Sequence, residues 1–240
     1  MTTPPDAAQL GREERRAATR ERILETAMRL LVEQGWEGLT IAKLARELDY
    51  AVGALYRYFP GKSAILTSLE RRVVERLGQD LERAAEAARG ARPEGTPEAA
   101  LLELRVAVGV YETLPLRRPT DFKLLMLSLG EPRELVASEE MDPSLLPGFR
   151  ALIGGFAARL IAATAAGART EGNALRRTLR LWGALHGVLQ LRKQGRFEPT
   201  LADAELAEEL VEDLLAGFGA DRAALDGIRD DARRLAHALP

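Results

Sequence analysis

Apolar residues recur every three or four positions along most of the chain, a period that predicts amphipathic helices. A first helix is predicted over 16–34, and Gly35 follows it as a terminating glycine. Thr40 is the expected N-cap of a second helix over 40–48, and a short third helix over 51–57 follows a tight turn. Since no segment alternates apolar and polar residues as a strand does, we expect an all-α fold.

The rest of the chain continues the helical pattern, which breaks at clusters of proline and glycine. Pro60-Gly61 precedes a long helix, and residues 90–97 form a connector. The predicted helices after the first three cover residues 62–89, 97–114, 119–130, 145–167, 171–194, 201–218 and 221–238.

Composition narrows the class of protein. The chain has 240 residues, no cysteine and two histidines, His186 and His237, so thiolate chemistry is excluded and histidine-based metal or acid–base chemistry is not expected. No stretch has the roughly 18 uncharged apolar residues of a membrane span, and the N-terminus lacks the apolar core of a secretory signal. We therefore expect a cytoplasmic protein that is not an enzyme and has no catalytic residues, metal, cofactor or membrane contact.

The two ends of the chain differ in charge. Residues 1–76 carry 13 lysines and arginines against 11 acidic residues, whereas residues 201–240 carry 10 acidic residues and 4 arginines. This mild asymmetry is typical of a chain that meets a polyanion at its N-terminal end.

The first three helices have the spacing of a helix-turn-helix unit. In such a unit the second helix of the pair, here 51–57, enters the major groove while the first lies across the DNA backbone. The spacing alone fits an ordinary three-helix corner of an all-α core equally well.

The residues of these helices decide between the two interpretations. They run in the order Leu39-Thr40, Leu44-Ala45, Gly53-Ala54-Leu55-Tyr56-Arg57-Tyr58-Phe59, Gly61-Lys62 and Leu66. This pattern closely resembles the DNA-binding domain of the tetracycline-repressor (TetR) family of regulators. The resemblance implies a helix-turn-helix DNA-binding domain at 16–69 and a C-terminal helical ligand-binding and dimerisation domain at 70–240. Residues 1–15 are expected to form a flexible N-terminal arm.

The turn departs from the family's usual Gly-Val-Ser, because it reads Asp49-Tyr50-Ala51. Aspartate adopts left-handed backbone angles at moderate cost, so we expect the turn to persist. Ala51 removes the usual serine cap of the recognition helix, and Asp49 is an alternative cap.

By the same resemblance, Thr40, Tyr56 and Lys62 are expected to contact DNA phosphates. The alternatives are a plain N-cap for Thr40, a half-buried aromatic for Tyr56 and a solvated lysine for Lys62. Arg20 and the arginines just before it either follow the DNA backbone or are simply solvated.

The exposed face of the recognition helix is formed by Tyr50, Ala51, Val52 and Ala54. Because these residues are mostly apolar, readout of the operator is expected to depend on thymine methyl groups and DNA shape. Arg57 is the best polar candidate for a contact to a base or a phosphate.

The C-terminal two thirds resemble the family in architecture only. The helices near 171–194 and 201–218 are expected to form a four-helix bundle in a homodimer, with Gly183 and Gly187 flattening one face. An intramolecular core is the alternative. A two-fold protein would bind double-stranded DNA at an inverted-repeat operator.

A small-molecule effector pocket is expected among the C-terminal helices, with a filled core as the alternative. Its apolar candidates favour a hydrophobic or amphipathic effector, and Arg105, Arg118 or Arg159 would meet an anionic group if the effector has one. The candidate wall residues are Tyr111, Phe122, Met126, Leu129, Leu152, Phe156, Trp182 and His186.

The sequence thus predicts a DNA-binding transcriptional regulator. The resemblance favours a repressor, since most members of this family are repressors, and the effector is expected to release it from its operator. A helical adaptor of the same fold that has lost operator binding is the alternative.

Overall fold

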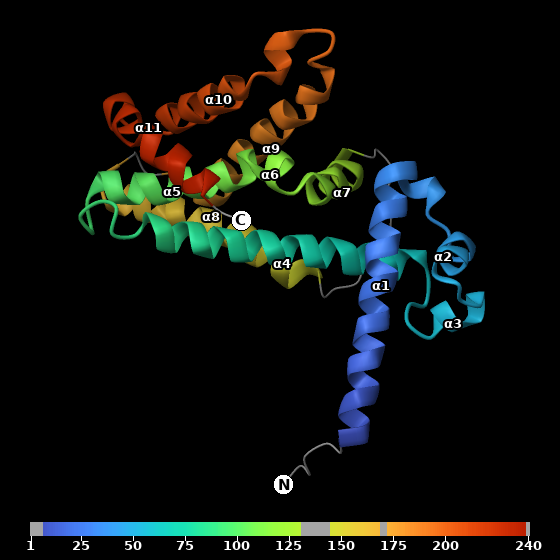
Figure 1. Cartoon of the computed structure of the whole chain (residues 1–240). Helices are drawn as coiled ribbons and strands as arrows, with labels where there is room; N and C mark the ends of the chain where they lie inside the picture. The colour runs from blue at the N-terminus through green and yellow to red at the C-terminus, as the bar shows by residue number, and fades with distance from the viewer. Residues whose placement is uncertain (1–6, 131–144, 169–171, 239–240) are drawn as a thin grey trace. The chain divides into compact units, whose positions relative to one another are not determined.

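The computed structural model describes residues 7–130, 145–168 and 172–238, and within these ranges every regular element is a helix (Figure 1). The all-α prediction is confirmed. Apart from the first helix, the predicted helices begin and end close to the observed positions, because the proline and glycine clusters that interrupt the apolar pattern also interrupt the backbone.

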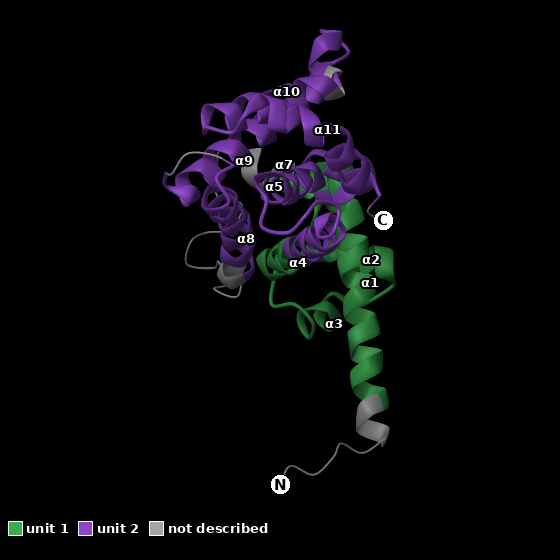
Figure 2. Cartoon of the chain, turned by 90° about the vertical axis from the view of Figure 1, so that its left-hand side faces the viewer, with its two compact units in different colours: residues 1–72, 122–145 green, residues 73–121, 146–240 purple. Residues whose placement is uncertain are grey.

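The chain divides into two compact units, shown in different colours in Figure 2. Unit 1 contains residues 1–72 and 122–145, and unit 2 contains residues 73–121 and 146–240. The long helix α4 (Lys62–Ala88) contributes residues to both units, and so does α7 (Pro119–Gly130).

Unit 1 is built around α1 (Ala7–Gly38), α2 (Ile41–Leu48), α3 (Val52–Tyr56) and the first turns of α4. Their apolar faces meet in a core whose fully buried side chains include Ile23, Leu30, Leu44, Leu55, Phe59 and Leu66. Gly35 leaves the helical region with φ 72° and ψ −175°, so the regular helix ends where the glycine predicts it.

The first helix begins earlier than predicted. Residues 7–15, assigned above to a flexible arm, belong to α1, while residues 1–6 lie outside the described ranges. This stretch is rich in alanine, glutamate and arginine, which have high intrinsic helix propensity. Residues 12–15 are exposed, so propensity and not packing explains the helix there.

Unit 2 is assembled around α5 (Pro97–Glu112), in which every residue from Leu104 to Tyr111 is buried. Two 3-10 turns (Arg192–Gln194 and Pro199–Ala202) lie between α9 and α10. The other helices of this unit are α6 (Leu114–Arg117), α8 (Leu145–Ala165), α9 (Ala174–Leu191), α10 (Ala204–Gly217) and α11 (Arg222–His237).

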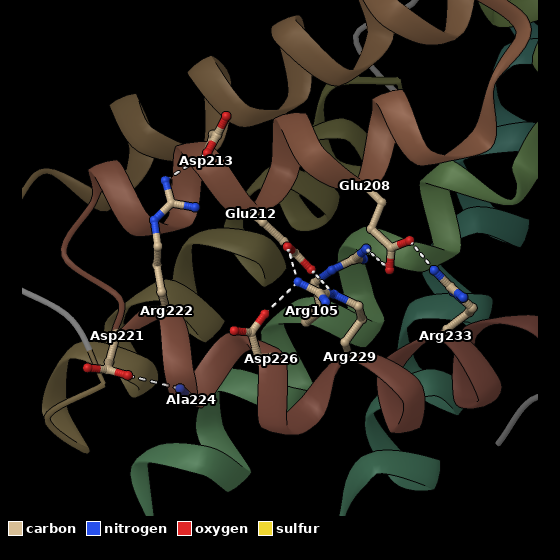
Figure 3. Close-up of polar contacts among 10 residues, drawn as sticks. All are labelled: Arg105, Glu208, Glu212, Asp213, Asp221, Arg222, Ala224, Asp226, Arg229 and Arg233. Atoms are coloured by element: carbon tan, nitrogen blue, oxygen red, sulfur yellow. Dashed lines mark hydrogen bonds and ion pairs between the residues drawn. The ribbon is translucent and has the colours of Figure 1, made fainter. Parts of the chain in front are cut away.

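The last helix, to which the sequence analysis gives no role, packs along α5. Ion pairs tie it to its neighbours: Arg229 binds Glu212 of α10 through two bonds of 2.7 Å, and Arg233 lies 2.5 Å from Glu208 (Figure 3). Arg105 of α5 completes the cluster, 3.6 Å from Glu208. Helix α11 therefore covers the central helix of unit 2.

One described helix is long and apolar enough to cross a membrane by length and composition alone: Gly148–Ala165 within α8. This segment contains Arg150 and Arg159, and the Arg159 guanidinium donates to the carbonyl of Leu81 in α4 at 3.2 Å.

Candidate nucleic-acid interface and ligand cavity

The turn between α2 and α3 is closed by backbone hydrogen bonds. Asp49 adopts the left-handed conformation (φ 57°, ψ 44°), the only described residue other than glycine with positive φ. The amide of Tyr50 donates to the carbonyl of Ala45 at 2.8 Å, as in a Schellman motif. Aspartate therefore takes the place of the family's usual glycine, and the helix-turn-helix geometry is kept.

The recognition helix α3 starts without a side-chain cap. Ala51 occupies the N-cap position with extended backbone angles, and no side-chain hydrogen bond caps the helix there. Asp49, the alternative cap considered above, instead serves as the C-cap of α2 through its backbone. The short helix is held by its packing, since Leu55 at its centre is buried.

The exposed surface of α3 is mostly apolar. Val52 is 43% exposed and Tyr56 is 52% exposed, so both can reach a neighbouring molecule. Ala51, just before Val52, is exposed, and Ala54, between Val52 and Tyr56, is half-buried. This surface offers methyl groups and one phenolic hydroxyl, which suits thymine methyl groups and a phosphate.

Polar side chains border this surface. Arg57 is exposed just after α3, at the C-cap position. Tyr50 is half-buried, and the guanidinium carbon of Arg22 lies 6.0 Å from the centre of its ring. Arg22 was not among the predicted site residues, because only the fold brings α1 beside the turn.

Thr40 serves as the N-cap of α2. Its hydroxyl oxygen accepts a hydrogen bond from the amide of Lys43 at 3.1 Å, and the residue is exposed. A capping threonine can also donate its hydroxyl proton to a phosphate. The geometry therefore fits both interpretations of this residue.

Lys62, at the start of α4, is not a freely solvated lysine. Its ammonium nitrogen lies 3.8 Å from the ring centre of Trp36, a cation–π geometry. Partial burial lowers the pKa of Lys62 from its usual value. The indole holds the ammonium group in place, and Trp36 is a supporting residue that the sequence reasoning missed.

Arg20 is part of the fold of unit 1. Its guanidinium donates to the carbonyl of Tyr58 and to the hydroxyl of Ser68, both at 3.1 Å, and lies 4.1 Å from the ring centre of Phe59. Burial, followed by the charge of Arg71, lowers its pKa. Arg20 is therefore held by contacts within unit 1 and is not simply solvated.

Unit 2 contains a small apolar cavity between α5, α8 and α9. Its volume of about 20 Å³ has room for about one water molecule. Three of the eight predicted wall residues are among its lining. Residues of all three helices line it, among them Val108, Tyr111, Phe156, Leu160, Thr178 and Trp182.

His186 lies beside this cavity and not in its wall. Its Nδ1 atom is 2.6 Å from the hydroxyl of Tyr111, and its ring lies 5.4 Å from that of Trp182. Burial lowers the pKa of His186 and raises that of Tyr111, so the imidazole is neutral and the phenol keeps its proton. The hydrogen bond between Tyr111 and His186 therefore joins two neutral groups.

Of the other predicted wall residues, Phe122, Met126 and Leu152 do not line the cavity, and the side chain of Leu129 lies outside the part of the chain that the structure describes. Phe122, Met126 and Leu129 lie on the part of α7 that belongs to unit 1. Leu152 is a half-buried residue of α8, four residues before Phe156.

The three arginines expected to meet an anionic effector all have partners elsewhere, and none lines the cavity. Arg105 binds Glu112 at 2.8 Å, and Arg118 binds the buried Asp80 at 3.0 Å. Arg159 donates to the carbonyls of Gly155 and Leu81. Among the described residues, no cluster of three or more possible metal ligands occurs.

Two parts of the chain match known domain families. Residues 23–69 match the family described as bacterial regulatory proteins, tetR family. Residues 105–214 match the tetracyclin repressor-like, C-terminal domain. The two matches fall on the helix-turn-helix region and on the helices that enclose the cavity.

Individual proteins show the same likeness. The HTH-type transcriptional repressor KstR of Mycolicibacterium smegmatis is 38% identical over 78 residues, which are 32% of this chain and 38% of that protein. The chain thus matches well under half the length of this relative.

Solved structures share the fold over most of the chain. SmeT, the repressor of the Stenotrophomonas maltophilia multidrug efflux pump SmeDEF, has a TM-score of 0.61 at 22% identity and covers 84% of this chain and 91% of its own. FadR of Bacillus subtilis, in complex with stearoyl-CoA, has a TM-score of 0.58 at 21% identity and covers 82% of this chain and 98% of its own.

Proposed function

Because the chain belongs to the TetR family of bacterial transcriptional regulators, we propose that it is a repressor that binds an inverted-repeat operator as a homodimer. A small apolar effector would release it from the operator. The family is one of regulators and not of enzymes, and we assign this chain no catalytic residue. We place it in the cytoplasm, where its DNA is.

The observation that carries the proposal is the α2–turn–α3 unit. The left-handed Asp49 closes the turn, Leu55 anchors α3 in the core, and the outer face of α3 is free to enter the major groove. Thr40 and Lys62 stand at the starts of α2 and α4, where hydroxyl and ammonium groups can bind phosphates.

Sequence readout would then depend on methyl contacts and DNA shape. Val52 and Ala51 present methyl groups, while Tyr50, Tyr56 and Arg57 offer the polar groups nearest to them. Apolar contact with the thymine methyl group distinguishes thymine from the other bases in the major groove. We therefore expect an operator in which specific thymines matter more than guanines.

The dimer would form through α9 and α10, which pack side by side in unit 2. On α9, Leu175 and Leu179 are 51% and 44% exposed, and Gly183 continues this exposed stripe one turn later. A Cβ atom at Gly183 or Gly187 would meet nothing within 4 Å, so a partner helix has room to approach. A second copy of the chain would cover these leucines and complete a four-helix bundle.

Release requires that the effector prefers the conformation in which the two recognition helices no longer match the operator. Helix α4 contributes residues to both units and is the natural connection between effector and DNA. Typical coupling free energies of about 1–3 kcal/mol would change operator affinity about 5- to 150-fold.

A gel-shift experiment with DNA from the region flanking the protein's own gene tests the proposal. We expect a discrete complex that resists competition by unrelated DNA, and Val52→Ala should weaken it while non-specific binding stays unchanged. If unrelated DNA competes as well as the flanking DNA itself, the chain has no specific operator. That result would favour the alternative, a helical adaptor of this fold that has lost operator binding.

A further inference from the structure

The cavity of unit 2 contains one buried hydroxyl that the fold leaves unused. Thr178 is 3% exposed and lines the cavity, and its hydroxyl oxygen has no hydrogen-bond partner among the described residues. A buried hydroxyl without a partner costs about 1–3 kcal/mol. Valine has nearly the same shape and would avoid that cost.

Four other threonines in or at the end of the described helices bond to their own backbone. A threonine inside a helix commonly donates to the carbonyl four residues earlier. Thr26 does so to Arg22 at 2.9 Å, and Thr164 to Leu160 at 2.9 Å. Thr19 and Thr113 make the same bond to Arg15 and Gly109. The Thr178 hydroxyl therefore lacks the usual bond to its own helix, in a residue that lines the cavity.

The other polar side chains that line the cavity are already engaged, while beside it the buried Nε2 atom of His186 also has no hydrogen-bond partner among the described residues. The hydroxyl of Tyr111 bonds to His186 and also interacts with the side chain of Trp182. The rest of the lining is aliphatic or aromatic, and no charged residue belongs to it. An anionic ligand would lose its hydration there without gaining a counter-charge.

The cavity as it stands is smaller than an effector site. Its volume of about 20 Å³ compares with about 300–1,000 Å³ for typical ligand pockets. Phe156 and Trp182 are half-buried side chains of its wall, so a ligand would enter the cavity by displacing them outward. An apolar molecule that entered would come to lie against Thr178.

We propose that the effector is an uncharged, apolar molecule with one oxygen that hydrogen-bonds to the Thr178 hydroxyl, and that Thr178 selects it over hydrocarbons and carboxylates. This inference rests on the proposed function, since it names the ligand class of the proposed effector site. It sets this chain apart from FadR, whose solved complex holds stearoyl-CoA, a ligand with charged phosphates.

Calorimetric titration of the full-length protein with three matched probes tests the selection: ethylbenzene, 2-phenylethanol and phenylacetate. We expect the wild type to bind the alcohol and to bind the carboxylate at least tenfold more weakly. Thr178→Val should lower the preference for the alcohol over ethylbenzene about 5- to 150-fold, because the alcohol's hydroxyl loses its partner. Thr178→Ser should retain the preference.

Thr164→Val is the matched control, because its hydroxyl bonds to the helix backbone and its removal should leave all three affinities unchanged. The inference is wrong if the wild type binds none of the probes, if phenylacetate binds as tightly as the alcohol, or if Thr178→Val keeps the wild-type preference. Operator binding, measured separately, separates the two proposals. If the protein binds no operator but Thr178→Val lowers its preference for the alcohol, the proposed regulator function is wrong and this inference stands. If the protein binds an operator but Thr178→Val leaves the preference unchanged, this inference is wrong and the proposed function stands.

Discussion

Gly109 marks the closest approach of α5 to the last helix. A Cβ atom at this position would lie 2.6 Å from the Cβ of Ala236, whereas ordinary contacts of such atoms begin at 3.4 Å. Neither atom belongs to a flexible side-chain end, so Gly109→Ala must push α11 roughly 1 Å away from α5. The shift would loosen the buried face of α11, which includes Leu225 and Ile228.

Two contributions of opposite sign determine how much Gly109→Ala changes the free energy of unfolding. Overpacking of this kind costs about 1–3 kcal/mol of unfolding free energy. Replacing glycine by alanine inside a helix contributes about 1 kcal/mol of stabilisation. Gly227→Ala, in α11, isolates the second contribution, because nothing lies within 4 Å of its added Cβ. Gly227→Ala should therefore be more stable than Gly109→Ala by about 1–3 kcal/mol.

Urea unfolding followed by circular dichroism, at one fixed protein concentration, measures these differences. Adding Ala236→Gly removes the clashing methyl group, so the double-mutant cycle of positions 109 and 236 should give a favourable coupling of about 1–3 kcal/mol. The reasoning is refuted if the coupling is within about 0.3 kcal/mol of zero, or if Gly109→Ala stabilises the protein as much as Gly227→Ala.

Three further predictions concern DNA, the dimer and pH. In fluorescence-anisotropy titrations, Lys62→Ala should weaken binding to all DNA sequences alike and lower the slope of log affinity against log salt concentration by about one unit per lost phosphate contact. A changed sequence preference at a constant slope would contradict the phosphate contact of Lys62. Leu179→Glu should convert the proposed dimer to monomers in sedimentation analysis, and a variant that stays dimeric would place the interface elsewhere. The bond to Arg229 lowers the pKa of Glu212, so this pair should stabilise the fold above the ordinary pKa of 4.5 and lose that effect as the pH falls below it. Glu212→Gln should lower the free energy of unfolding by about 1 kcal/mol at neutral pH, measured by urea unfolding, and should reduce the loss of stability below pH 4.5. A variant whose stability falls below pH 4.5 as steeply as that of the wild type would contradict the role given to this ion pair.

Much of the fold follows from local signals. Apolar periodicity and breaker residues predict nearly all helices, and Gly35 and Asp49 adopt the positive φ that their positions require. The first turns of α1 are not predicted, because residues 7–15 lack the apolar stripe of an amphipathic helix. Helix α6 escapes because Pro115 reads as a breaker, although it occupies the first turn, where proline is tolerated.

The candidate sites are less accessible to sequence reasoning, since they depend on how helices meet. The contact of Lys62 with Trp36 joins residues of α4 and α1, and neither residue shows it alone. Amphipathic patterns identify buried faces but not which face borders a cavity, which explains why Phe122 is absent from the lining while Tyr111 is present. Thr178 stands out only when its missing backbone bond is seen.

The claim that this chain is a sequence-specific repressor is tested most directly by selecting its binding sites from genomic fragments and footprinting them with the purified protein. The account predicts an inverted repeat with half-site centres about 34–36 Å or somewhat more apart, protected on both halves and released when an apolar effector is added. Protection of DNA without a repeated half-site, or binding that depends on salt but not on sequence, would contradict it.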